Sequence, residues 1–281
     1  MTATSIALAL WFATARPIPS LAARAATSVL SDHLLITWYG NPHSPRMGVL
    51  GEYSGEALAA GLSAQAAAYQ ALTAKHVLPA YQLVATVAQC DPGAGDMYRR
   101  RESTSVIQSM LDGAKAHGFK LVLDVQPGRS TVRDEVTALE PFLRDPDVYL
   151  ALDPEFTMTS CDVPGQTIGR MSGDDVNAAI GILENIIALR HLPPKVLIVH
   201  QFRNDMLPDK KRIRSSSTVD VVLNMDGFGS QTLKRSSYRM IMRQGQLAFA
   251  GIKLFYRRDT HLFTPAEVMA LSPTPSVVVY Q

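Results

Sequence analysis

Two carboxylates end a short apolar stretch near the middle of the chain, at a spacing suited to acid–base chemistry. Asp153 and Glu155 close the run at residues 148–156. Apolar runs of this length that are bounded by turn residues are typical of buried strands. Side chains alternate along a strand, so the two acids are expected on the same side, roughly 7 Å apart along the backbone. A strand that is apolar until it ends in paired acids is typical of the catalytic face of a parallel α/β enzyme.

The segments that must position these acids alternate regularly along the chain. Further strands are predicted at residues 33–39, 80–89, 119–126, 195–201, 219–226, 248–256 and 276–280. Helical spacing of apolar residues predicts helices at 55–76, 104–117, 174–190 and 231–243, one that ends at 143 after a cap at Ser130 or Thr131, and a last one capped by Thr264. Residues 208–215 are expected to form a short basic helix or turn. Eight strands alternating with helices predict a single α/β domain, a closed (β/α)8 barrel of the TIM type, with a doubly wound open sheet as the alternative.

The N-terminus is expected to differ from the barrel, which we place at residues 31–281. Residues 5–15 are apolar and end in Ala-Thr-Ala, a cleavage-like pattern, although no Lys or Arg precedes them. The run is too short to predict a membrane span. Residues 17–30 are rich in Ala and predict a helix that covers the barrel, whose eighth strand ends the chain. We expect a secreted or cell-surface protein, with the cytoplasm as the alternative; in an exported chain Cys90 and Cys161 could form a disulfide.

The composition excludes several classes of function. Hydrophobic residues make up 47% of the chain and charged residues 19%, as in packed globular proteins. The formal net charge is only +2, so we expect no nucleic-acid partner. Neither a Gly-x-Gly-x-x-Gly after the first strand nor a Walker A sequence is present, and two cysteines lack histidines at zinc-ligand spacing. We therefore expect no cofactor and assign no metal ligands; the oligomeric state is left open.

In a barrel, the C-terminal ends of all strands meet on one face, and polar groups follow nearly every predicted strand. Acids inside apolar runs lose hydration energy unless they are paired or hydrogen-bonded, and this cost is common where charge has a function. The expected catalytic residues are Asp124, Asp153, Glu155 and Asp226. The expected substrate-binding residues are Tyr39, Gln126, His200, Gln201, Asn224, Lys253 and Tyr256.

The chemistry expected of this set is glycoside hydrolysis, which uses two carboxyl groups on either side of the scissile bond. Crowded carboxylates repel one another, so at least one pKa should rise, as a general acid requires. We predict Glu155 as the proton donor, with Asp153 orienting it or adjusting its proton affinity. Asp226 or Asp124 would act as nucleophile, base or charge stabiliser. The expected partner is a carbohydrate or a related small molecule or polymer.

Several motifs resemble those of a family of bacterial, often exported proteins of unassigned function. They are Trp-Tyr-Gly-Asn-Pro, Met-Gly-Val-Leu-Gly-Glu, Leu-Asp-Val-Gln-Pro-Gly-Arg-Ser, Ala-Leu-Asp-Pro-Glu-Phe, Val-His-Gln-Phe, Met-Asp-Gly-Phe-Gly and Ile-Lys-Leu-Phe-Tyr. The resemblance covers residues 33–281 and implies a barrel fold but no known reaction. Asp153-Pro-Glu155 is also similar to the Asp-x-Glu of chitinase-like glycosidases, in which the Glu is the acid. Their longer acidic signature is absent, because Tyr149 and Ala151 stand in its place.

Two other functions are compatible with the same residues. A metal-dependent hydrolase or lyase could use the four acids together with His200, since oxygen-rich sites for Mg²⁺ or Ca²⁺ have no obligatory spacing. A non-catalytic barrel could instead bind a cell-surface polymer. A chelator would distinguish the first from a glycosidase, and a Glu155→Gln variant would distinguish an enzyme from a binding protein.

Overall fold

A computed structural model describes residues 28–243, 247 and 249–281. The apolar run at residues 5–15 and most of the expected helix at 17–30 lie outside the described residues. The signal-like pattern and the larger part of the expected N-terminal cover therefore stay predictions.

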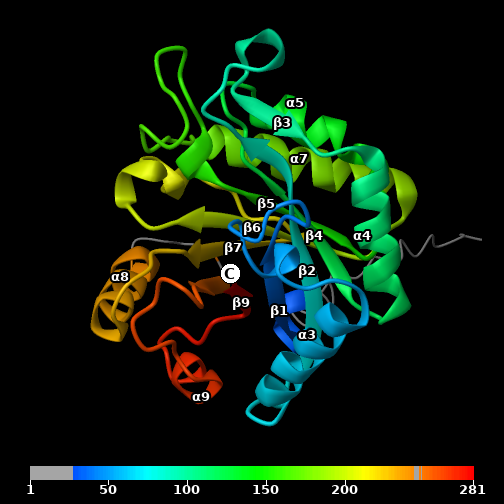
Figure 1. The fold of residues 1–281 in the computed structure, drawn as a ribbon, viewed down its shortest axis with the longest axis vertical. Coiled ribbons are helices and arrows are strands. Elements are labelled where there is room, and N and C mark those ends of the chain that lie inside the picture. Colours follow the sequence, from blue (N-terminus) through cyan, green and yellow to red (C-terminus); the bar gives the residue numbers. More distant parts are fainter. Residues whose placement is uncertain (1–27, 244–246, 248) are drawn as a thin grey trace, which may run out of the picture.

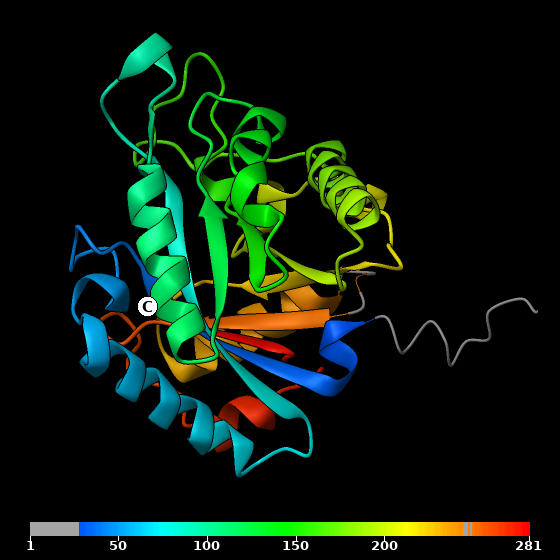
Figure 2. The same ribbon diagram turned by 90° about the vertical axis from the view of Figure 1, so that its right-hand side faces the viewer.

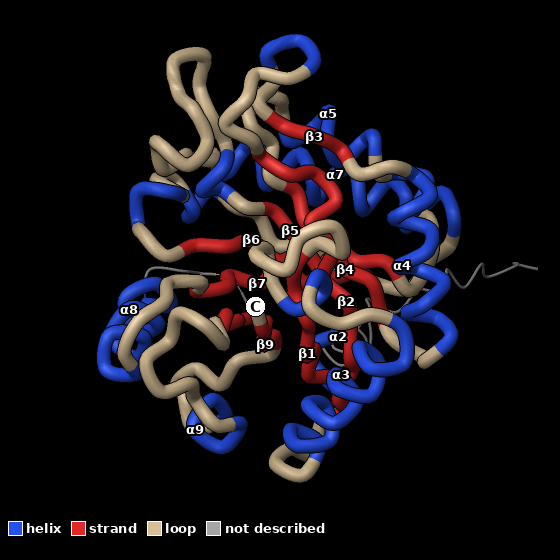
Figure 3. Tube along the Cα trace, viewed as in Figure 1, coloured by secondary structure: helices blue, strands red, loops and turns tan. Residues whose placement is uncertain are grey.

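The parallel strands close into a barrel, as the sequence predicts (Figures 1 and 3). These strands are β1 His33–Gly40, β2 His76–Ala88, β4 Lys120–Val125, β5 Val148–Leu152, β6 Lys195–Gln201, β7 Val219–Met225, β8 Phe249–Leu254 and β9 Val277–Tyr280. The ring closes because β1 pairs in parallel with both β2 and β9. Closure excludes the doubly wound open sheet and supports a TIM-type α/β barrel.

Helices surround the barrel and complete its βα units (Figure 3). They are α3 Gly55–Gln70, α4 Thr104–Ala116, α5 Val132–Ala138, α6 Glu140–Leu143, α7 Gly173–Arg190, α8 Gln231–Arg243 and α9 Pro265–Met269. Between β6 and β7 the chain forms the 3-10 turns η4 Asn204–Met206 and η5 Lys210–Arg212, which is the turn alternative expected for residues 208–215. Each connection returns the chain to the end of the barrel where the next parallel strand must begin.

Three departures from the predicted elements have a clear physical reason. The first helix ends at Gln70 rather than at residue 76, because the Gln70 side chain binds Lys75 O and Val77 N and fixes a turn that begins β2 at His76. Pro79 is tolerated in β2 because pairing with β4 begins only at Ala80. The helix expected to reach residue 143 breaks into α5 and α6, where Pro141 cannot continue the hydrogen bonding.

The third departure concerns the strand that carries the paired acids, which ends at Leu152 rather than at residue 156. Asp153 precedes a 3-10 turn, η3 Pro154–Phe156, in which Glu155 is the central residue. Pro154 has no N–H to donate to a neighbouring strand, so the ladder stops before it. The two acids therefore share a turn at the barrel mouth instead of successive inward positions of one strand.

A short antiparallel strand, β3 Arg99–Arg101, pairs with residues 86–88 at the C-terminal end of β2. Its two outer arginines bind one buried carboxylate: Arg99 Nε donates to Glu135 Oε1 at 2.9 Å and Arg101 Nε to Glu135 Oε2 at 2.7 Å. Glu135 belongs to α5, so this ion pair joins the second and third βα units. β3 thus adds a rim above the barrel mouth.

Side-chain alternation divides the apolar residues into two cores. Along β5, Tyr149 and Ala151 point into the barrel, where they pack with inward residues of the other strands. Val148, Leu150 and Leu152 point outward and pack with the helices. The same alternation in every strand fixes which polar side chains near the strand ends point inward.

A short helix, α2 Val29–Asp32, directly precedes β1 at the N-terminal end of the barrel. Buried Leu30 packs in the inner core, and its backbone N–H donates to Asp220 Oδ2 at 2.8 Å. Ser28 Oγ donates to the same oxygen at 3.0 Å. Figure 2 shows α2 and the C-terminus at opposite ends of the barrel. In the described part of the chain, no helix has the length and apolar character needed to cross a membrane.

Candidate active site

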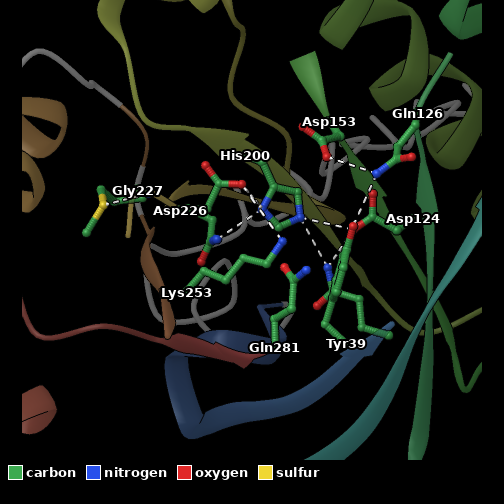
Figure 4. Close-up of polar contacts among 12 residues, drawn as sticks. Tyr39, Asp124, Gln126, Asp153, His200, Asp226, Gly227, Lys253 and Gln281 are labelled. Carbon is green, nitrogen blue, oxygen red and sulfur yellow. Dashed lines mark hydrogen bonds and ion pairs between the residues drawn. The ribbon is translucent and has the colours of Figure 1, made fainter. Parts of the chain in front are cut away.

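Inward-pointing side chains from five strands meet just below the C-terminal mouth of the barrel (Figure 4). They are Tyr39 of β1, Asp124 of β4, His200 of β6, Asn224 of β7 and Lys253 of β8. All five are buried. Each lies an even number of residues from an inward apolar residue of its strand, such as Val122 for Asp124 and Ile198 for His200. Alternation therefore gathers residues that are up to 214 positions apart in the sequence, from Tyr39 to Lys253.

An ion pair between Asp124 and His200 forms the floor of this cluster. His200 Nε2 lies 3.0 Å from Asp124 Oδ2, and Gln82 Nε2 donates to the same oxygen at 2.7 Å. Thr37 Oγ1 donates to Gln82 Oε1 at 2.7 Å and so fixes the Gln82 amide. Burial opposes ionisation of Asp124, but the charge and hydrogen bond of His200 hold its pKa below the ordinary value. Burial also opposes charge on His200, yet Asp124 raises its pKa, so each member favours the charged form of the other.

Asp226 and Lys253 form a second pair of opposite charges, which lies next to His200. His200 Nδ1 lies 3.5 Å from Asp226 Oδ2 and 3.1 Å from the Asn224 amide. Lys253 Nζ lies 3.9 Å from the same Asp226 oxygen and 3.6 Å from the centre of the Tyr39 ring. Negative and positive groups thus alternate from Asp124 through His200 and Asp226 to Lys253. Alternation of this kind offsets part of the cost of burying four ionisable groups together.

Asp153 lies across the mouth from Lys253, next to the Gln126 amide (Figure 4). Gln126 Nε2 lies 3.4 Å from Asp153 Oδ2 and 3.3 Å from the Tyr39 hydroxyl, while Gln126 Oε1 accepts from Ala88 N at 3.1 Å. Burial raises the pKa of Asp153 well above its usual range, although His200 opposes the shift; the neighbouring Asp226, Asp124 and Glu155 carboxylates raise it further. These causes together favour the protonated form of the Asp153 carboxyl group.

Glu155 projects from a turn that two glycine contacts fix in place. Gly128 N donates to Phe156 O at 2.9 Å, and Gly169 N donates to Glu155 O at 2.6 Å. The Glu155 side chain is half-buried at the mouth. Burial raises its pKa and the charge of Asp226 raises it further, while Lys253, His200 and Arg258 oppose the shift. A half-buried carboxyl group that keeps its proton at higher pH than usual is a suitable general acid.

The mouth opens into a cleft of about 570 Å³. Its floor contains Tyr39, Gln126, Asp153, Glu155, Asp226 and Lys253. Its walls contain Arg46, Met47, Val87, Ala88, Phe156, Phe202, Gly227, Phe228, Leu233, Ser237, Phe255, Arg258 and Gln281. Gln281 follows β9 and donates to Met47 O at 3.2 Å, so the last residue of the sequence closes one side of the cleft. A cleft of this size holds one small ligand or a short part of a polymer.

Three carboxylate oxygens at the floor of the cleft or just beneath it have no hydrogen-bond partner among the described residues. They are Oδ1 of Asp124, Oδ1 of Asp153 and Oδ1 of Asp226, all buried. A buried acceptor without a donor costs about 1 to 3 kcal/mol. Asp153 and Asp226 line the cleft, so these two carboxyl groups lie next to the space that a bound molecule would occupy.

The structure gathers most of the predicted site residues, but two of them lie away from the cluster and the cleft. Gln201 points outward from β6, where its amide donates to Arg203 O at 2.8 Å and accepts from Lys210 at 3.2 Å. Tyr256 follows the end of β8, stacks on Tyr280 with ring centres 5.4 Å apart, and donates its hydroxyl to Gln65 on α3 at 3.3 Å. Neither residue lines the cleft. Substrate binding by these two residues stays a prediction.

Asp124, His200 and Asn224 join the cluster as residues beneath the cleft rather than on its surface, since none of them lines it. Sequence reasoning missed Gln82, which alternation could have found because it lies two positions before the inward Val84. It also missed the phenylalanines and Arg46 of the cleft wall. Their loops follow no simple period, so no sequence signal places them there.

The part of the chain that the structure describes contains no preformed metal site. No three His, Cys, Asp or Glu side chains in it are grouped so that they could hold an ion. Cys90 and Cys161 are both free and exposed. The two thiols are thus not bridged in this structure.

Comparison with models of known protein families finds no match for this chain, and comparison with curated protein sequences finds none either. The resemblance to exported bacterial proteins therefore stays a prediction, and arguments about function depend on the site itself.

Proposed function

We propose that this protein is a carbohydrate-active hydrolase of the glycoside-hydrolase type, with Glu155 as its proton donor. The observation that carries the proposal is the group of three acids, Asp153, Glu155 and Asp226, that lines the floor of an aromatic-walled cleft. Carboxyl groups of this kind bind the hydroxyl groups of a ligand. Carbohydrates supply several hydroxyl donors on one rigid ring.

The walls of the cleft support the same class of ligand. Phe156, Phe202, Phe228 and Phe255 line it, and Phe228 packs edge-to-face on Phe255 with ring centres 5.8 Å apart. Sugar rings present C–H groups that pack on aromatic faces while their hydroxyls bind polar groups at the ring edge. An acidic floor below an apolar wall matches both parts of such a ring.

The raised pKa values of two acids at the floor support acid catalysis. Glu155 reaches the cleft with a raised pKa, so it retains the proton that a leaving-group oxygen needs. Burial raises the pKa of Asp153 as well, so a second carboxyl group of the same site favours its protonated form. Asp226, held by Lys253 and His200, is the carboxylate proposed to act as nucleophile, base or stabiliser of positive charge on the sugar. Asp124 is proposed to act through His200 rather than on the substrate.

The proposal is tested by Glu155→Gln, assayed on aryl glycosides and on oligosaccharides of different linkage. The variant keeps the size of the side chain and removes its titratable proton. We expect turnover to fall by about two to four orders of magnitude while sugar binding is retained. Glu56→Gln on the exposed surface of α3 is the matched control and should leave turnover unchanged. Unchanged turnover in Glu155→Gln would show that Glu155 is not the acid.

The free oxygens also favour a second candidate, a metal-dependent hydrolase or lyase, because Mg²⁺ and Ca²⁺ prefer oxygen ligands. A chelator separates the two: loss of turnover that Mg²⁺ or Ca²⁺ restores supports this candidate. A third candidate, a non-catalytic barrel that binds a cell-surface polymer, predicts binding without turnover in the unmodified protein.

The location of the protein is part of the proposal. We place the protein at the cell surface or outside the cell. The Ala-Thr-Ala pattern at residues 13–15 favours export. N-terminal sequencing of the mature protein tests this, with cleavage after residue 15 as the expected result. A mature chain that keeps residues 1–15 would favour the cytoplasm.

A further inference from the structure

Two arginines without carboxylate partners border the cleft. Arg46 and Arg258 both line it, and both are exposed. Neither forms an ion pair with an acid in the described ranges 28–243 and 249–281, whereas Arg257, the neighbour of Arg258, binds Glu52 Oε1 at 2.9 Å. Arg257 does not line the cleft. Arg257 therefore pairs with an acid of the protein, whereas the adjacent Arg258 faces the cleft.

The turn that carries Arg258 is rigid. Buried Asp259 accepts from Gly229 N at 3.0 Å and from Phe255 N at 2.9 Å, and it pairs with Lys234 Nζ at 3.0 Å. Lys234 Nζ also donates to Gly227 O at 2.8 Å and Lys253 O at 2.7 Å. One buried ion pair therefore joins the loop after β8 to the loop after β7 and to the backbone of Lys253.

The same two loops fix the position of the Arg258 guanidinium. It lies 5.1 Å from the ring centre of Phe228, which belongs to the loop after β7. Contact with an aromatic ring restricts the guanidinium without using its hydrogen-bond donors. Its donors are therefore available to a ligand, from a backbone that does not have to reorganise.

Three basic residues, Lys253, Arg258 and Arg46, line the cleft together with the acids of its floor. The influence of Arg258 and Lys253 reaches Glu155, since both charges oppose the rise of its pKa. A ligand that carries a negative charge near Arg258 would find free guanidinium donors there, while its hydroxyls lie near the carboxyl groups of the floor.

We propose that the substrate of this cleft is acidic: a sugar whose anionic group is bound by Arg258, assisted by Arg46, while its ring lies over the acidic floor. This inference rests on the proposed function and names its substrate class. The planar fork of a guanidinium binds a carboxylate, sulfate or phosphate through two parallel hydrogen bonds. A carboxylate at the sugar C6 position, as in a uronic acid, and a phosphate ester share this chemistry.

The test measures binding to the full chain carrying Glu155→Gln, by calorimetry at low salt. The ligands are glucuronate, glucose and glucose 6-phosphate, which differ only in the substituent at C6. We expect an anionic ligand to bind at least about tenfold more tightly than glucose, as charge-assisted hydrogen bonds provide. Tighter binding of glucuronate would identify the anionic group of the substrate as a carboxylate, and tighter binding of glucose 6-phosphate would identify it as a phosphate. Both results support the inference.

Two variants in the same background identify the residue responsible. Arg258→Gln should abolish the preference for the anionic ligand while glucose binds as before. Arg257→Gln, one residue away and paired with Glu52, should leave the preference intact. Glucuronate and glucose 6-phosphate binding no more tightly than glucose, no binding of any of the three, or a preference that survives Arg258→Gln would each overturn the inference. Turnover of neutral glycosides that depends on Glu155, together with one of these results, would leave the proposed function intact.

Discussion

His200 Nε2 lies 3.0 Å from Asp124 Oδ2 in the centre of the barrel, where neither side chain is exposed to solvent. The pair is 76 residues apart in the sequence and lies directly beneath the cleft. Its other contacts are polar on both sides, with Gln82 on Asp124 and Asn224 and Asp226 on His200. The floor of the candidate active site is therefore an ionic network rather than a layer of aliphatic side chains, and its charges set the protonation of the carboxyl groups above.

Replacing Asp124 with Asn should lower the pKa of His200 and destabilise the protein. Burial alone opposes the imidazolium, so without the aspartate charge His200 loses its proton at lower pH. Breaking a buried ion pair by removing one partner costs about 3 to 5 kcal/mol. Imidazole NMR titration and urea unfolding measure the two effects. Asp112→Asn on the exposed face of α4 is the control; an unchanged His200 titration in Asp124→Asn would show that the pair is not ionic.

The same ion pair should give the unfolding free energy a defined dependence on pH. The lowered pKa of Asp124 contributes stability above its unfolded value of about 3.9, and this contribution is lost as pH falls through the folded pKa. The raised pKa of His200 contributes stability that is complete below about 6.5 and is lost as pH rises through the folded pKa. The difference between the protein and Asp124→Asn should thus be largest between about pH 4 and 6.5. A difference that does not decrease on either side of this range would contradict the assignment.

The activity proposed for Glu155 should decline on the alkaline side at the pH where this residue loses its proton. Burial and Asp226 raise its pKa above the ordinary value of about 4.3, so turnover should persist above that pH. Lys253 opposes this shift, so Lys253→Met should move the alkaline limb of kcat/KM to higher pH, whatever its effect on the maximal rate. A limb that stays in place or moves to lower pH would assign the titration to another group.

Gly128 should be intolerant of any side chain because it supports the turn of Glu155. It has a φ of +62°, and a Cβ there would lie 2.3 Å from Met97 O, a backbone atom that cannot move aside cheaply. Gly128→Ala is expected to displace the turn and reduce both turnover and stability. Gly118→Ala is the matched control: its φ is +70° but its Cβ would meet nothing, so only the backbone strain of about 1 to 2 kcal/mol applies. Equal losses in the two variants, measured by thermal unfolding, would show that the contact with residue 97 is unimportant.

The ion pair that joins β3 to α5 should stabilise the rim of the barrel. Arg99 and Arg101 hold the buried Glu135 carboxylate, and although burial opposes ionisation, these arginines lower its pKa. Glu135→Gln should reduce the unfolding free energy by about 1.5 to 3 kcal/mol at neutral pH. Because the folded pKa is lowered, the difference should be present above about pH 4.3 and disappear as pH falls through the folded value. Glu140→Gln removes an exposed i,i+4 pair with Arg144 and should cost about 0.5 kcal/mol or less.

The barrel itself could be predicted from the sequence, because each strand is an apolar run with a polar end and each helix has its own period. Alternation by itself also places Lys253, His200 and Gln82 inward and Gln201 outward. Tyr256 follows the end of β8 at Leu254, so alternation does not place its side chain. Which residue Gln82 contacts depends on the register between β2 and β4.

What the sequence determined by itself is the kind of residue at each strand end: a period of two fixes the direction of a side chain from local sterics alone. The tertiary structure decided which of these groups touch, that the pKa of Asp153 is raised while that of Asp124 is lowered, and that Arg258 faces the cleft while Arg257 binds Glu52. Those outcomes depend on burial and on distances between segments that meet only when the barrel closes. Desolvation and Coulomb energies follow those distances, and no local pattern in the chain contains them.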